Sequence, residues 1–84
     1  MNTQKPLINE NNFCWGTGLN PDALRKFEEF GFVTPIFSTS AGNLYSEEDL
    51  DLVLRMRKFV GEFSLRDAYE KAWKQMNFRA AHAA

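Results

Sequence analysis

Apolar residues recur at helical spacing in three stretches of the chain, and each stretch begins at a recognisable cap. Asn20 followed by Pro21 has the form of an N-cap with proline at the first helical position, so we expect a helix from Asn20 to Phe30 that ends at Gly31. Ser46 and Ser64 each precede an acidic residue three positions later, a pattern typical of a helix start. The helix after Ser46 carries apolar residues on two sides, which predicts a central position in the core.

Between the first two of these helices lies a pattern typical of a β-hairpin. Residues 32–37 and 43–45 are rich in strand-forming side chains and flank the small polar loop 38–42. Residues 11–16 form a weaker helix candidate, and residues 17–19 are expected to turn. The predicted order is therefore helix, turn, helix, two-stranded hairpin, helix, helix, which is a mainly α fold. We expect one domain over 10–78, a flexible arm over 1–9 and a flexible tail over 79–84.

Composition narrows the class of protein. The 84 residues allow one small core, and a hydrophobic share of 44% suits a folded domain. The single cysteine, Cys14, and the single histidine, His82, provide neither a disulfide framework nor a metal cluster. We therefore expect no metal, no cofactor and no catalytic activity. No apolar run is long enough for a membrane span or a signal peptide, so the expected location is the cytoplasm, without membrane contact.

Charge is unevenly distributed along the chain. The formal net charge is −1, but residues 1–54 hold three basic and eight acidic side chains, whereas residues 55–84 hold seven basic and three acidic ones. A cationic surface would therefore be weighted toward the C-terminal part.

Two sequence segments resemble the DNA-binding domain of MerR-type regulators. These are TGLNPDALRKFEEFGFVTP and LYSEEDLDLVLRMRKFVGEFSLRDA, and the resemblance covers about residues 10–76. It implies a winged helix-turn-helix fold that places the helix 20–30 in the major groove of double-stranded DNA. The implied function is that of a small transcriptional regulator or an excisionase-like architectural factor of a bacterium or phage.

The resemblance also implies which residues face DNA: Thr17, Asn20, Asp22, Ala23, Arg25, Lys26, Asn43 and Tyr45. Asn20 and Asp22 could instead cap the helix. Lys26 replaces an aromatic residue of the family, and the hairpin lacks the family's basic tip. Because DNA affinity depends on the number of neutralised phosphates, Arg25 and Lys26 alone would bind weakly, and we expect a further contribution. It could come from Arg55, Arg57 and Lys58, from Lys71, Lys74 and Arg79, or from a second copy.

A second resemblance supports an alternative function. Chaperone modulators of the CbpM type share this fold and bind a J-domain protein instead of DNA. The matching residues here are Phe13-Cys14, Thr17-Gly18 and 31–35. An acidic N-terminal half would suit a basic protein partner.

Four further features each have a structural and a functional interpretation. The run Glu47-Glu48-Asp49 is explained by helix capping, and Cys14 by packing as a small core residue. Trp15 could be core or an exposed partner surface. The last helix has an apolar surplus that predicts a homodimer contact, made by Tyr69, Trp73, Met76 and Phe78.

Overall fold

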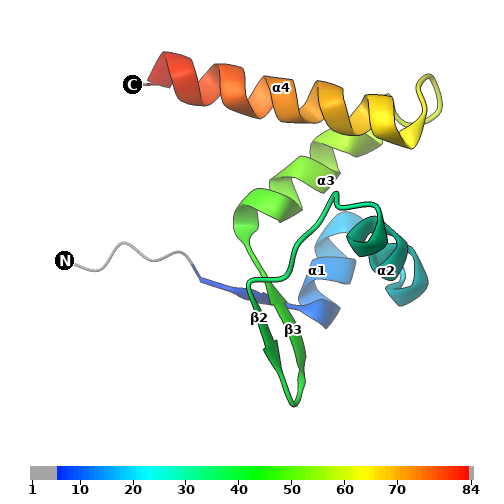
Figure 1. Ribbon diagram of the computed structural model, residues 1–84, viewed down its shortest axis with the longest axis vertical. Helices are drawn as coiled ribbons and strands as arrows, with labels where there is room; N and C mark the ends of the chain where they lie inside the picture. The colour runs from blue at the N-terminus through cyan, green and yellow to red at the C-terminus, as the bar shows by residue number, and fades with distance from the viewer. Residues whose placement is uncertain (1–5, 84) are drawn as a thin grey trace. The chain divides into compact units, whose positions relative to one another are not determined.

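The structure, a computed structural model, describes the backbone of residues 6–83 and the side chains of residues 6–77. Within these residues it is mainly helical with one small antiparallel sheet (Figure 1). The elements are β1 (Ile8–Asn9), α1 (Glu10–Thr17), α2 (Pro21–Glu29), β2 (Phe37–Thr39), β3 (Gly42–Tyr45), α3 (Glu47–Phe59) and α4 (Leu65–Ala83).

The chain divides into two compact units, Met1–Leu50 and Asp51–Ala84, so α3 begins in the first unit and continues in the second. The first unit contains α1, α2 and the whole sheet. The second contains the remainder of α3 and all of α4. No helix in the described residues is both long enough and apolar enough to cross a membrane.

The first two helices are set by three local signals. The Asn9 side chain accepts a hydrogen bond from the Asn12 N–H at 2.8 Å and caps α1. Gly18 ends α1 in the left-handed region, at φ 79°, where a residue with a Cβ is disfavoured. Asn20 then caps α2 as predicted, with Pro21 as its first residue. The weak helix candidate at 11–16 is confirmed, and it is one residue longer at each end.

The sheet differs from the predicted hairpin in two respects. Its strand order is β1-β3-β2, because Ile8 and Asn9 pair with Tyr45 and Leu44 on the far side of β3. The arm predicted over 1–9 is therefore wrong at its C-terminal end, while residues 1–5 lie outside the described residues. The hairpin itself, β2 with β3, is confirmed.

The strand predicted from residue 32 is the second correction, because β2 begins only at Phe37. Phe32 and Val33 are buried, but their backbone pairs with no strand. The Thr34 N–H donates to a side-chain oxygen of Asp49 at 3.0 Å, and Pro35 has no N–H. The apolar pattern at 32–33 thus reflects burial in the core and not a sheet position.

In the core of the first unit, aromatic contacts join α1 to β3 and α2 to the segment that follows it. The rings of Phe13 and Tyr45 lie 4.7 Å apart, and both residues are fully buried. Phe27 and Phe32 pack edge to face at 5.6 Å, so the end of α2 is held by the segment that follows it. Offset and edge-to-face pairs of this kind fix side-chain geometry as well as burying area.

Both later helices begin at the predicted caps. Ser46 Oγ accepts from the Asp49 N–H, and Ser64 Oγ accepts from the Asp67 N–H. The central position predicted for α3 is confirmed, because three of its side chains are buried: Leu52, Val53 and Met56. Leu54, however, is exposed, and Phe59 is only half-buried. The backbone of α4 remains helical to Ala83, across residues expected to form a flexible tail.

Candidate nucleic-acid interface

α2 presents its basic residues to solvent because two apolar residues anchor its opposite side. Leu24 and Phe27 are buried in the first unit. Arg25 and Lys26, which follow Leu24 and precede Phe27, are exposed as a consequence of the helical repeat. Neither makes an ion pair within the described residues, so both cations are available to an anionic partner.

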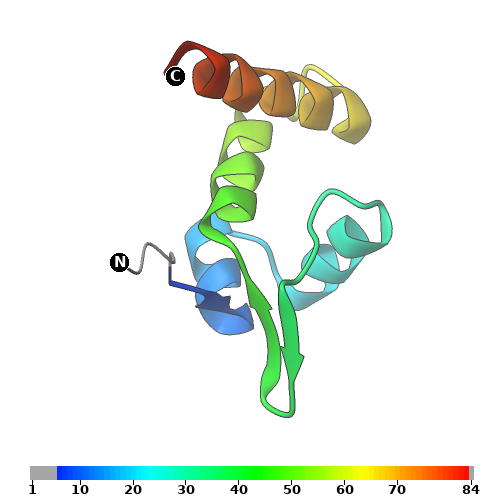
Figure 2. The same cartoon turned by 60° about the vertical axis from the view of Figure 1, so that its left-hand side comes forward.

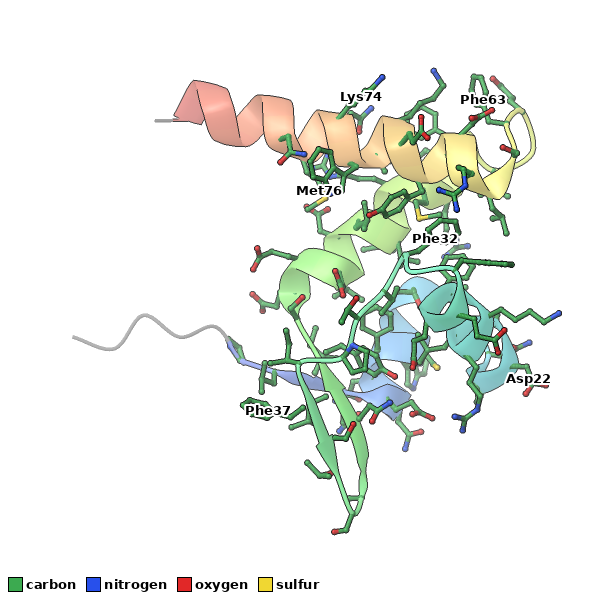
Figure 3. The ribbon with its side chains drawn as sticks, viewed as in Figure 1. Asp22, Phe32, Phe37, Phe63, Lys74 and Met76 are labelled. Atoms are coloured by element: carbon green, nitrogen blue, oxygen red, sulfur yellow. The ribbon has the colours of Figure 1, made fainter. Side chains whose placement is uncertain are left out.

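The first turn of α2 carries an acidic residue, Asp22, and follows the cap Asn20, whose side chain is already hydrogen-bonded within the protein. Asn20 Oδ1 accepts a hydrogen bond from the Ala23 N–H at 2.7 Å, so this oxygen caps the helix. Ala23 is half-buried. Asp22 is exposed and points away from the body of its unit (Figure 3). A carboxylate at this position interacts favourably with the helix dipole but repels phosphate. Asp22 could therefore contact DNA only by accepting a hydrogen bond from a donor on a base edge.

Thr17 is a correction to the predicted DNA-facing set. It is fully buried, and its hydroxyl donates to the Phe13 carbonyl at 2.7 Å. The same oxygen accepts from the Leu19 N–H at 3.3 Å. Thr17 therefore holds the turn between α1 and α2 in shape and has no side-chain surface for DNA.

Tyr45 is the second correction, for a similar reason. It is fully buried, and its hydroxyl donates to Glu28 Oε2 at 2.6 Å. Burial raises the pKa of Tyr45, and the Glu28 carboxylate raises it further, so the hydroxyl stays protonated as a donor. This hydrogen bond joins α2 to β3 and thereby fixes the hairpin relative to the basic residues of α2.

The hairpin extends beyond α1 and α2 and carries no charge at its tip (Figure 2). Ser40 and Ala41 form the turn. Asn43 is half-buried, and its Oδ1 accepts from the Ser38 hydroxyl at 2.9 Å across the two strands. Thr39 Oγ1 donates to the Gly42 carbonyl at 2.7 Å. The tip is thus a neutral surface stiffened by its own side chains, without a cation for phosphate.

The three predicted cations of α3 lie in the second unit and differ in their contacts and exposure. Arg55 forms a 3.1 Å ion pair with Asp51 and donates to Gln75 Oε1 at 3.3 Å. Part of its guanidinium is therefore already hydrogen-bonded within its own unit. Arg57 and Lys58 are exposed at the end of the helix.

The acidic run at the start of α3 has a structural task that sequence reasoning recognised only in part. Besides the cap at Ser46, Asp49 Oδ2 accepts the Thr34 N–H and so holds the chain entering the hairpin. Burial raises the pKa of Asp49, the Thr34 N–H partly opposes this, and Glu48 adds to it. Sequence reasoning missed Asp49 and Glu28 as tethers because their partners lie 15 and 17 residues away, so no local pattern marks them.

The residues predicted to form a dimer contact lie along α4. Trp73 is 52% exposed, and Tyr69 and Met76 are half-buried. Tyr69, Trp73, Glu70 and Lys74 line a shallow hollow of about 330 Å³. Lys74 and Met76 leave α4 on opposite sides (Figure 3), so Met76 is not on the same surface as the hollow. The side chain of Phe78 lies outside the described residues.

No protein-family model and no curated protein sequence matches this chain. Among the described residues, no group of three His, Cys, Asp or Glu side chains could hold a metal ion. The exposed face of α2 and the hairpin beside it are the features from which a function can be inferred.

Proposed function

We propose that this protein binds double-stranded DNA through a winged helix-turn-helix, with α2 as the recognition helix and β2–β3 as the wing. The observation that carries the proposal is the arrangement inside one compact unit. Two helices joined by a tight turn at Gly18 are followed by a projecting hairpin, and α2 exposes Arg25 and Lys26. An α-helix fits the major groove, which is about 12 Å wide, and the second helix of such a pair is the one that enters it.

The charges predict weak binding by a single copy. Affinity for DNA comes largely from counterions released when cations neutralise phosphates, with a slope of about −0.9 per phosphate contact. α2 offers two cations, the hairpin offers none, and Asp22 and Glu29 oppose phosphate on the same helix. The protein therefore gains from contacts made by Arg57 and Lys58, or from a second copy bound to an adjacent half-site.

Fluorescence anisotropy of labelled duplex DNA tests the proposal. We expect binding that weakens strongly between 50 and 200 mM salt, with a preference for the upstream region of the protein's own gene over random duplex. Arg25→Ala should weaken binding and reduce the salt slope by about one. Glu29→Gln is the matched control on the same helix, and it should leave binding unchanged or slightly tighter.

Two results would contradict DNA binding by α2. If the wild-type protein fails to bind at tens of micromolar in low salt, or if Arg25→Ala and Glu29→Gln weaken binding equally, α2 is not a DNA-binding helix. The exposed cations would then have to be assigned to a solvated helix face.

We also propose that two copies associate through α4. The proposal is supported by Trp73, whose half-exposed indole lines the hollow together with Tyr69. Glu70 and Lys74 line the same hollow, and each could form an ion pair with the other residue in a second copy related by a two-fold axis. Sedimentation should show a dimer that Trp73→Ala converts to a monomer. A wild-type monomer at tens of micromolar would contradict the proposal.

A further inference from the structure

Trp15 is an anomaly on the surface of the first unit. It lies on α1 with 84% of its surface exposed, more than Trp73 at 52% or Phe37 at 59%. An indole exposes a large apolar area at a cost in free energy, and such side chains are enriched where proteins bind one another. Neither the DNA-binding helix nor the dimer contact uses this residue.

The surroundings of Trp15 form a shallow hollow and not an isolated projection. Asn11, Cys14, Trp15 and Gly18 follow the spacing i, i+3, i+4 and i+7, which places them on one face of the helical turn. Together with Leu19 they line a hollow of about 580 Å³, named here the Trp15 hollow. Gly18 has no side chain to fill it.

The charge around the Trp15 hollow selects the sign of its partner. Its five lining residues include no cation. Glu10 stands one helical turn before Cys14, which places it beside Cys14 at one side of the hollow, and its carboxylate adds to the effect of burial in raising the pKa of the Cys14 thiol. The described residues of the first unit carry seven carboxylates and two cations. This environment repels phosphate and attracts a cation.

We infer that the Trp15 hollow binds a basic segment of a partner protein, with an Arg or Lys side chain over the indole of Trp15 and the Glu10 carboxylate on the Cys14 side of the hollow. Tryptophan is the best aromatic partner for a cation, and the aliphatic stem of Arg or Lys would cover Leu19. The surface uses no residue of the α2 face, so the protein can hold DNA and this partner through different helices. Trp15 is the residue expected to contribute most of the binding free energy.

Substitution of Trp15 leaves the fold intact on this account, because the side chain is mostly in solvent. Trp15→Ala should keep the wild-type melting temperature and the wild-type affinity for duplex DNA. Trp73→Ala is the matched control, since it removes the other tryptophan from a different unit of the chain. Glu10→Gln isolates the charge without removing the apolar surface.

The test is selection from a random peptide library on the full-length protein, with counter-selection on Trp15→Ala. We expect the recovered peptides to combine Arg or Lys with apolar residues. Titration of these peptides should give affinities about tenfold weaker for Trp15→Ala, weaker for Glu10→Gln, and unchanged for Trp73→Ala.

Three results would overturn the inference. One is a selection that yields no Trp15-dependent peptide, or only acidic ones. Another is loss of DNA affinity in Trp15→Ala, which would make the hollow a nucleic-acid contact. The last is loss of self-association in Trp15→Ala, which would make a second copy the occupant. Because DNA binding by Arg25→Ala is measured separately, failure here leaves the proposed function standing, and the reverse also holds.

Discussion

At the scale of single residues, two carboxylates in the first unit act as tethers between segments distant in sequence. Glu28 accepts the Tyr45 hydroxyl and joins α2 to β3, and Asp49 accepts the Thr34 N–H and joins α3 to the chain entering the hairpin. A charged acceptor makes a stronger hydrogen bond than a neutral one, and removal of the donor leaves it partly desolvated and unpaired. These contacts fix the hairpin relative to α2.

Tyr45→Phe should therefore lower the free energy of unfolding by about 1–3 kcal/mol, because Glu28 loses its donor while the ring packing against Phe13 remains. Urea unfolding measures this. Combination with Glu28→Gln should be non-additive, since both single changes break the same bond. Additive losses would show that the two side chains do not interact.

Asp49→Asn should change stability in a pH-dependent way. Burial raises the pKa of Asp49 in the folded state, so folding favours its protonated form. The stabilisation is present below the ordinary Asp range and is lost as pH rises through the folded pKa. Asn keeps an acceptor for Thr34 and does not titrate. Urea unfolding should show the variant becoming more stable relative to the wild type as the pH rises above the ordinary Asp range and through the folded pKa. A constant difference, or one of opposite sign, would contradict this.

Part of the candidate site was predictable at this scale and part was not. The exposure of Arg25 and Lys26 follows from the helical repeat around Leu24 and Phe27. Thr17 and Tyr45 were misassigned to DNA because side-chain burial depends on contacts between segments far apart in sequence. For Trp15 the pattern left core and surface open, and the structure shows surface.

At the scale of elements, helix starts were predictable because caps are local signals. Asn20, Ser46 and Ser64 each accept a backbone N–H three residues later, as their sequence contexts predict. Strand assignments were less successful. β1 has only two residues, and its pairing with β3 depends on partners 37 and 35 positions away. Residues 32–33 have strand-like composition, but their side chains are used in the core.

Asn20→Ala should destabilise the fold by about 0.5–2 kcal/mol, because the Ala23 N–H loses its acceptor at the start of α2. Asn20→Asp should restore most of this loss, since aspartate is an equally good N-cap. Thermal unfolding of both variants makes the comparison. Equal destabilisation by Ala and Asp would show that the cap does not stabilise α2.

At the scale of the whole molecule, the chain combines surfaces of opposite character on separate elements. α2 exposes two cations, whereas α1 exposes an indole. The sequence indicates an uneven charge distribution but not which helix face carries each charge. DNA binding by α2 and partner binding at the Trp15 hollow should respond differently to the same substitutions, so the two activities can be tested independently.

We propose that α2 and the hairpin, and not α1, contact the DNA. The most direct measurement is the perturbation of backbone amide signals in two-dimensional NMR during titration with duplex DNA, over the whole chain. We predict that the largest shifts cluster at residues 20–26 and 38–43, with the amides of Asn11, Cys14 and Trp15 unaffected. Shifts centred on Trp15, or no shifts in α2 at saturating duplex, would show that α2 is not the helix that contacts DNA.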